Sequence, residues 1–169
     1  GQLTRPGDLI LVLAGKGHNG DDARHASQNF SDREVYLINV NEPEAALKEF
    51  ESQLSLSPAL VIDGLFGIGL NRGLDKHWAK LIEGINASGV PVLAIDVPSG
   101  LHAGTGEPQG AAIRASITLT LGAPKTGLLA ASAWPFVGRL EVVPDIGLVA
   151  LDLDSDVQWT LAQDFAAYP

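Results

Sequence analysis

One stretch near the amino end constrains the fold of this 169-residue chain more than any other. Residues Leu9–Ala14 form an uninterrupted apolar run, LILVLA, which has the length and composition of a strand buried on both faces. A loop with three glycines, GKGHNG (15–20), follows it directly, and two aspartates come next. We therefore expect a buried strand over 10–14, a tight glycine turn, and a helix over 21–29.

Two later stretches have the same form, and each ends on an acid. Leu60–Asp63 and Val92–Asp96 are short apolar runs that pass into loops rich in Gly, Pro or Ser. Short buried strands that alternate with helical segments are typical of an α/β fold with a parallel sheet. The predicted fold class is therefore a three-layer α/β/α, doubly wound, mainly parallel sheet of Rossmann-like type. In such a sheet the carboxyl ends of the strands line one crevice, where ligands bind.

The rest of the pattern predicts further strands and helices in alternation. Strands are predicted over 35–40, 60–62, 91–95, 116–121 and 137–143. Helices are predicted over 43–54 and 76–87, where apolar residues recur at helical spacing, and a short one over 125–131. Pro43 suits a first helical turn, and Gly89 suits a helix end.

Composition limits the partners and the compartment. The net charge of −9 disfavours nucleic acid and anionic membrane surfaces as partners. Cysteine is absent, so neither a disulfide nor a thiolate metal site can form. No apolar run approaches the roughly 20 residues that span a bilayer, and the histidines at 25, 77 and 102 lack metal-ligand spacing. We expect one cytoplasmic domain over 1–147, with 148–169 as a tail or linker toward a second domain.

The glycine loop admits two interpretations. Gly15–Gly20 matches the G-x-G-x-x-G pattern of dinucleotide-binding turns, but the same residues also make a tight strand–helix turn without a ligand. Asp21 and Asp22 at the expected helix start would repel a pyrophosphate there. Asn19 offers an amide oxygen suited to a hard cation, and Glu42 follows the second strand where a ribose-binding acid could sit.

Three later loops carry further candidate groups, each with an ordinary alternative. Asp63 opens a loop with four glycines and Arg72, which suits a phosphate or is a plain surface loop. Asp96 ends a buried strand with Ser99 nearby, and it is either an acid/base group or a carboxylate bonded to the following turn. Lys125 faces the same crevice or stays solvated.

Together these segments resemble the YjeF N-terminal domain family, the NAD(P)H-hydrate epimerases. The resemblance runs from about residue 8 to residue 147, and its motifs occur in the family's order. They are GKGHNGDD (15–22), DGLFGIGL (63–70), DVPSG (96–100) with TGE (105–107), GAPK (122–125) and DIG (145–147). The chain departs from the family at 18–23, which reads HNGDDA where the usual loop is NNGGDG, and the segment 22–35 is shorter than usual.

The resemblance implies an activity on damaged cofactor. The family interconverts the R and S forms of hydrated NADH and NADPH (NADHX and NADPHX), which carry a hydroxyl on the reduced nicotinamide ring. A companion ADP- or ATP-dependent NAD(P)HX dehydratase, specific for the S form, then restores the cofactor, and bifunctional relatives carry it in the same polypeptide. The resemblance also implies a bound potassium ion and a homodimer. The alternative is a non-catalytic YjeF-type module that binds a ligand or a protein.

The same resemblance assigns roles to individual residues. It implies that Asp96 is the acid/base for loss and return of the hydroxyl, with Lys125 supporting it. It implies that Asn19, Asp63 and Ser99 hold the potassium ion. The implied substrate-binding residues are His18, Asn19, Gly20, Asp21, Asp22, Gly67, Ile68, Gly69, Leu70, Asn71, Arg72, Gly73 and Asp96.

Overall fold

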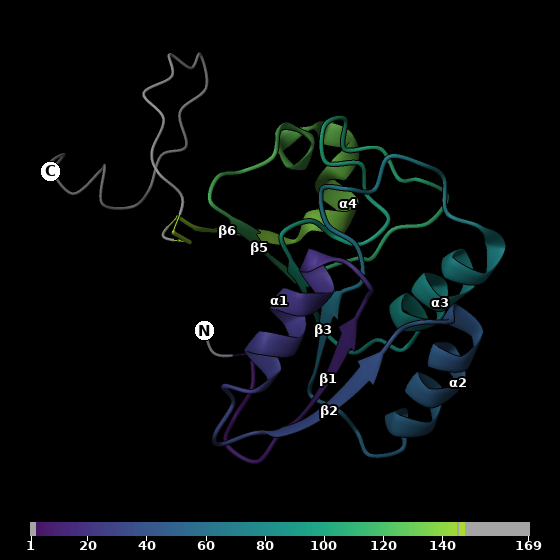
Figure 1. Ribbon diagram of the computed structural model, residues 1–169, viewed down its shortest axis with the longest axis vertical. Helices are drawn as coiled ribbons and strands as arrows, with labels where there is room; N and C mark the ends of the chain where they lie inside the picture. The colour runs from purple at the N-terminus through teal and green to yellow at the C-terminus, as the bar shows by residue number, and fades with distance from the viewer. Residues whose placement is uncertain (1–2, 145, 148–169) are drawn as a thin grey trace, which may run out of the picture.

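The computed structural model describes residues 3–144, 146 and 147, and these residues form a six-stranded sheet. All neighbouring strands are parallel, in the order β2-β1-β3-β4-β5-β6 (Figure 1). The strands are β1 (Leu9–Ala14), β2 (Glu34–Asn39), β3 (Leu60–Gly64), β4 (Val92–Ile95), β5 (Ile117–Leu121) and β6 (Arg139–Val143). The predicted parallel sheet is confirmed.

Helices cover both faces of the sheet. They are α1 (His18–Ser27), α2 (Pro43–Leu54), α3 (Lys76–Ala87) and α4 (Trp134–Val137), with 3₁₀ turns at Thr126–Leu129 and Ala131–Ala133. Helix α1 lies on one face, while α2 and α3 pack together on the other (Figure 1). The chain moves from β1 outward to β2 and then back past β1 to β3. Because right-handed crossovers in opposite directions place their helices on opposite faces, the arrangement is doubly wound, as predicted.

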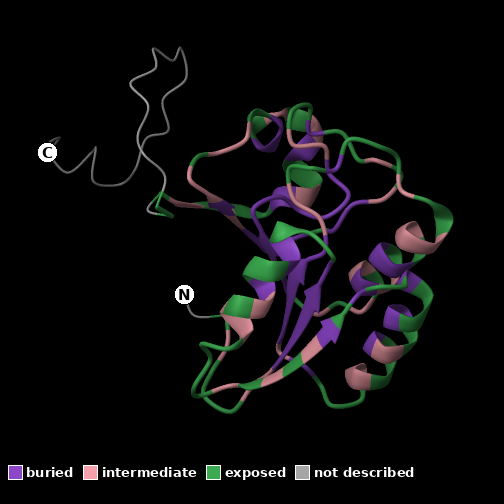
Figure 2. Ribbon diagram, viewed as in Figure 1, coloured by how far each residue is buried: buried purple, intermediate pink, exposed green. Residues whose placement is uncertain are grey.

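Strand β1 is central because its side chains alternate between two apolar cores. Leu11 and Leu13 face the side of α2 and α3, where they join a cluster with the fully buried Phe50. Ile10 faces the other side and packs in a cluster with Ala23 of α1. Figure 2 shows the central strands buried beneath helices on both sides. A strand in this position has no solvent face, which explains its uninterrupted apolar sequence.

The bounds predicted for α2 and α3 are confirmed. Pro43 occupies the first turn of α2, where its missing N–H leaves no bond unmade. The carboxylate of Asp75 caps α3 by accepting hydrogen bonds from the backbone N–H groups of His77 and Trp78, at 2.8 and 3.1 Å. These bonds hold the pKa of Asp75 below its ordinary value, and the bond from Trp78 has the largest effect.

Other predicted bounds were wrong by a few residues. Helix α1 begins at His18 instead of residue 21, because extended Gly17 lets the helix start inside the glycine loop. Strand β3 continues to Gly64, since its last two residues still pair with β1. The helix predicted over 125–131 is a pair of 3₁₀ turns, and α4 was not predicted.

The predicted tail over 148–169 lies outside the described residues. Within the part of the chain that the structure describes, no helix has both the length and the hydropathy needed to cross a membrane.

The strand order creates a topological switch point between β1 and β3. The connections from these two neighbouring strands leave in opposite directions, which opens a crevice at their carboxyl ends. The loops there approach closely: the Gly15 N–H donates to the Gly64 carbonyl at 3.0 Å. A Cβ on Gly15 would lie 2.1 Å from the Leu65 carbonyl oxygen, so only glycine fits this position. The glycine loop therefore forms one wall of the crevice.

Candidate active site

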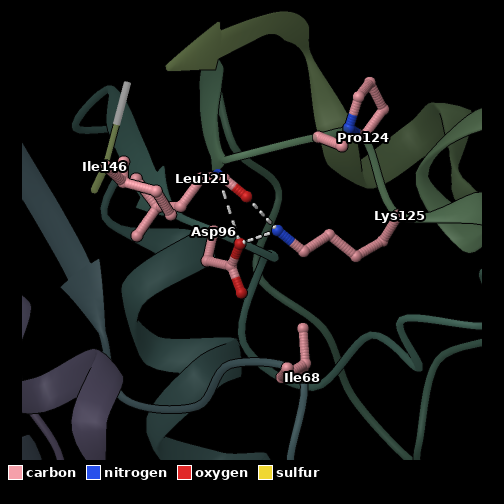
Figure 3. Close-up of a pocket in the computed structure, with 7 residues that line it drawn as sticks. Ile68, Asp96, Leu121, Pro124, Lys125 and Ile146 are labelled. Atoms are coloured by element: carbon pink, nitrogen blue, oxygen red, sulfur yellow. Dashed lines mark hydrogen bonds and ion pairs between the residues drawn. The ribbon is translucent and has the colours of Figure 1, made fainter. Parts of the chain in front are cut away.

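Two cavities meet at the carboxyl ends of the strands, and Asp96 and Ile68 line both of them. The larger has a volume of about 1110 Å³ and follows the loops after β1, β2 and β3. The smaller, of about 450 Å³, is mostly apolar and is lined by Ile68, Asp96, Leu121, Ala123, Pro124, Lys125 and Ile146 (Figure 3). The Asp96 carboxylate therefore stands between a polar compartment and an apolar one.

The Asp96 carboxylate is held by one of its two oxygens. Asp96 follows β4 and has a left-handed backbone, with φ of 67°, which few residues other than glycine adopt without cost. Its Oδ1 accepts a hydrogen bond from the Leu121 N–H at 3.2 Å and forms an ion pair with Lys125 (Figure 3). Its Oδ2 has no hydrogen-bond partner among residues 3–144, 146 and 147. One fixed oxygen and one open oxygen suit a carboxylate that exchanges a proton with a ligand.

The Lys125 ammonium has an acceptor for each of its three protons. They are Oδ1 of Asp96, the Leu121 carbonyl at 2.7 Å and Oγ1 of Thr120 at 3.2 Å. A lysine satisfied in this way orients the neighbouring Asp96 side chain, and it has no donor left for a substrate. The geometry is that of a positioning group behind Asp96.

Asp63 is fully buried and is the acceptor for three donors. Oδ2 accepts from the Ser99 N–H at 2.8 Å, and Oδ1 accepts from the Ser99 hydroxyl at 2.6 Å and the Leu65 N–H at 3.2 Å. Burial raises the pKa of Asp63 to about 6, although the hydrogen bonds from Ser99 and Leu65 act in the opposite direction. A cation next to this carboxylate would relieve its desolvation.

Asn19 provides an unsatisfied side-chain oxygen near Asp63 and Ser99. Its Nδ2 donates to the Phe66 carbonyl at 2.9 Å, while its buried Oδ1 has no hydrogen-bond partner in the described part of the chain. The Phe66 N–H donates in turn to the Ser99 hydroxyl at 2.9 Å, which links Asn19 to Asp63 through the intervening loop. Buried acceptors are nearly always satisfied in native proteins, so the Asn19 oxygen is suited to accept from a water or to ligate an ion.

The chemistry of this cluster suits a hard cation better than a transition metal. No group of three His, Cys, Asp or Glu side chains is placed to hold a metal ion in the described residues. The oxygens available come from an amide, a carboxylate, a hydroxyl and a main-chain carbonyl, which are ligands for hard cations. Asn19, Asp63 and Ser99, predicted from three separate motifs, are brought together here.

Most of the predicted substrate-binding residues line the larger cavity. They are His18, Asn19, Asp22, Gly67, Ile68, Gly69, Leu70, Asn71, Arg72, Gly73 and Asp96. Gly20 and Asp21 do not line it. Gly20 packs against the backbone of Gly15, and the Asp21 carboxylate forms an ion pair with Arg24 at 2.8 Å.

The early start of α1 also changes the electrostatics expected at the glycine loop. The first backbone bond of the helix joins the Asp21 N–H to the Gly17 carbonyl at 3.1 Å. The N–H groups of residues 18–20, in the first turn of α1, therefore have no acceptor within the helix, and His18 and Asn19 of this turn line the cavity. Asp21 is turned to Arg24 and Asp22 still lines the cavity, so the helix start carries one carboxylate toward an anion instead of the two that the sequence suggested.

The Gly20→Ala variant tests whether this glycine is needed for packing. A Cβ on Gly20 would lie 2.0 Å from the Gly15 carbonyl oxygen, so backbone must move. We expect the unfolding free energy to fall by about 1–3 kcal/mol in urea denaturation. The matched control is Gly73→Ala, where a Cβ meets open space and the change should stay within about 0.5 kcal/mol. Equal losses in the two variants would contradict the packing role.

Sequence reasoning missed part of the cavity wall. Asn41 and Glu44, at the start of α2, and His77 and Trp78, at the start of α3, line the larger cavity. His77 Nδ1 lies 2.8 Å from the Glu44 carboxylate, so this partly exposed histidine forms part of the cavity wall. Trp78 meets Phe66 edge to face, with ring centroids 4.7 Å apart. Only the pairing of α2 with α3 brings these residues to the site.

Fold and site together define a doubly wound α/β domain with buried carboxylates at its switch point. The chain matches the family described as YjeF-related protein N-terminus over residues 24–127. A yeast protein, ynu0 (YNL200c), has a crystal structure with a similar fold, at a TM-score of 0.52 and 19% identity, covering 72% of this chain and 61% of that one.

Curated relatives agree with this match. The NAD(P)H-hydrate epimerase of Limosilactobacillus fermentum is 33% identical, covering 82% of this chain and 75% of its own length. The NAD(P)H-hydrate epimerase of Achromobacter xylosoxidans is 42% identical, with 69% and 64% covered. The bifunctional NAD(P)H-hydrate repair enzyme Nnr of Thermosynechococcus vestitus is 38% identical over 85% of this chain but only 32% of its own length. The chain belongs to the YjeF N-terminal domain family.

Proposed function

We propose that this chain is an NAD(P)H-hydrate epimerase, an isomerase that interconverts the R and S forms of hydrated NADH or NADPH. The observation that carries the proposal is the position of Asp96, whose open oxygen lies where the two cavities meet. Two relatives named for this activity, 33% and 42% identical, support it. The reaction needs one group that gives a proton to the leaving hydroxyl and takes one from the added water, and the Asp96 carboxylate can serve as that group.

Asp96 acts as the acid and then as the base. Its protonated carboxyl group gives a proton to the ring hydroxyl as the C–O bond breaks, so that water leaves and the ring nitrogen lone pair stabilises the cation. Water then adds to the other face of the same carbon and returns a proton to the carboxylate, which inverts the centre and regenerates the enzyme. Lys125 keeps Oδ1 in place throughout, and Oδ2 makes the transfer.

The two cavities divide the substrate. The smaller, mostly apolar one takes the reacting ring, because apolar side chains line it next to the Asp96 carboxylate. The larger one takes the sugars and the diphosphate along residues 67–73 and the start of α1. Arg72 and Lys16 supply positive charge to that cavity. Glycines allow a ligand to approach the backbone closely, as at Gly67, where an added Cβ would lie 3.6 Å from Oδ2 of Asp96.

A potassium ion is the proposed cofactor, held by Asn19, Asp63 and Ser99. The orphaned Asn19 oxygen and the buried Asp63 carboxylate support this assignment. When bound, the ion would supply positive charge that orders the loop after β3 and offsets the burial of Asp63.

The ion ligand can be tested by thermal unfolding of Asn19→Ala. Wild-type Tm should rise when potassium chloride replaces choline chloride at equal ionic strength, by about 2–4 °C for each kcal/mol of binding. The variant should lose most of this gain because it lacks the Oδ1 ligand. Asn41→Ala, an exposed asparagine on another wall of the same cavity, should keep the full gain. An unchanged gain in Asn19→Ala would remove Asn19 from the ligand set.

The activity is tested with a dehydratase that consumes only the S form. Purified chain is added to this dehydratase and an R/S mixture of hydrated NADH, and recovery of NADH is followed by absorbance. We expect the R fraction to be recovered faster than spontaneous epimerisation allows. Recovery at the spontaneous rate would sink the enzyme proposal and leave a binding module. A dehydratase partner and a homodimer remain predictions from the family resemblance, and a cytoplasmic location remains a prediction from composition.

A further inference from the structure

We propose that Glu42 determines cofactor specificity and makes the site select hydrated NADH over hydrated NADPH. The inference rests on the proposed function and deepens it. Glu42 would accept a hydrogen bond from the 2′-hydroxyl of the adenosine ribose, and it would repel the 2′-phosphate that distinguishes the NADPH form.

The strand order places Glu42 at the far end of the cavity from the reacting carboxylate. Ala14 of β1 pairs with Asn39 of β2, and the Val40 N–H donates to the Ala14 carbonyl at 2.8 Å. The chain then turns beside the glycine loop into Glu42, which lines the larger cavity together with Gly17 and His18. The end of β2 is three strand spacings from the end of β4, which is about 14 Å. A dinucleotide whose reacting ring lies at Asp96 therefore extends across the switch point toward Glu42.

The diphosphate falls naturally between these two ends. The start of α1 and the loop after β3 lie over the two central strands of this path, and both line the larger cavity. Lys16 and Arg72 belong to these same central loops. The cations of the cavity are thus placed for the diphosphate in the middle, and Glu42 stands beyond them on the β2 side.

Glu42 is the acid after β2 that has a free carboxylate within the described residues; Asp22 of α1 also lines the cavity. Glu44 is paired with His77 at 2.8 Å, and Asp75 is occupied as the cap of α3. The Glu42 side chain has no hydrogen bond or ion pair within the described residues and does not cap α2, although it occupies the cap position. Glu42 is exposed at the cavity wall, so a ligand hydroxyl can reach its carboxylate.

The charge on this wall discriminates against a third phosphate group. A 2′-hydroxyl donates to a carboxylate, and a hydrogen bond to a charged group contributes enough to change affinity about tenfold or more. A fully ionised 2′-phosphate has no proton to donate. The Glu42 carboxylate would repel it, and Glu44, two residues further along the chain, lines the same cavity. A site that favours the phosphate would instead place an arginine at this position.

The test compares kcat/KM for separately prepared hydrated NADH and hydrated NADPH in wild type and in Glu42→Gln, at fixed ionic strength. Wild type should prefer hydrated NADH by about tenfold or more, and the preference should fall about tenfold in Glu42→Gln. The matched control is Glu51→Gln, which removes an equal charge from an exposed position of the same helix outside the cavity and should keep the wild-type ratio. Binding of NAD⁺ and NADP⁺ by calorimetry gives the same comparison without turnover.

Each outcome separates this inference from the proposed function. A wild type that turns over both hydrated cofactors, with a ratio that Glu42→Gln leaves unchanged, overturns the role of Glu42 and leaves the epimerase standing. Equal losses for both substrates in Glu42→Gln also overturn it, because the residue would then serve binding in general. If neither substrate is turned over, the proposed function itself fails, and the NAD⁺ and NADP⁺ affinities alone decide the role of Glu42.

Discussion

Replacing Asp96 by asparagine is expected to lower the epimerisation rate by at least about 100-fold, the usual contribution of a positioned general acid or base. Asparagine keeps the shape and can still accept hydrogen bonds from Leu121 and Lys125 through its amide oxygen. It cannot take up or release a proton at the atom that stands in place of Oδ2. The loss should therefore appear in kcat, with KM little changed, in the assay coupled to the S-specific dehydratase.

A matched change at the surface provides the control for this variant. Asp32 is exposed, forms an ion pair with the neighbouring Arg33 and lies outside both cavities. Asp32→Asn should retain the wild-type rate. Circular dichroism should show that Asp96→Asn is folded, since its left-handed backbone also suits asparagine. A normal rate in Asp96→Asn would refute its role in proton transfer and would leave the family assignment intact.

The second large effect concerns pH and the buried carboxylate of Asp63. Its folded-state pKa of about 6 lies above the ordinary value of 3.8, so the folded protein binds more protons than the unfolded chain between these two values. The unfolding free energy therefore falls as pH rises through this window. The difference amounts to up to about 3 kcal/mol between pH 3.5 and pH 7 in potassium-free buffer.

The contribution of Asp63 is isolated by comparison with Asp63→Asn, which carries no titrating group at this position. Urea unfolding at a series of pH values gives the stability difference between the two proteins, and titration of all other groups largely cancels. We expect the unfolding free energy of wild type to fall relative to that of Asp63→Asn as pH rises from about 4 to about 6, and the difference to level off above that. A difference that stays constant across the series would mean that burial does not raise the pKa of Asp63.

Local patterns in the sequence were sufficient for the fold and for the list of chemical groups. The apolar run of β1 and the helical spacing in α2 and α3 depend on residues near one another in the chain, so their prediction succeeded. The same holds for the acids that end strands: parallel strands bring their carboxyl ends to one edge, whichever loops follow. Asp63, Asp96 and Asn19 could thus be assigned to one crevice before any distance was known.

Helix starts were harder to predict, for a local reason. Two aspartates signalled the beginning of α1, yet the helix starts three residues earlier at His18. A helix can begin after an extended glycine at the cap position without any side-chain cap, so the sequence contains no capping residue that marks this start. The Asp21 carboxylate, taken as a group facing the substrate, instead pairs with Arg24 one turn later.

What the sequence by itself determined is the doubly wound sheet, the family and the chemical groups at the carboxyl ends of its strands. Only the tertiary structure decided which of those groups are free and which have partners. Lys125 reaches Asp96 across 29 positions of the chain, and Ser99 reaches Asp63 across 36. Glu44 is paired and Glu42 is free among the residues described, because α3 presents His77 to only one of them. Periodicity and propensity act over a few residues, whereas the partner of a side chain depends on which distant segment folding brings against it.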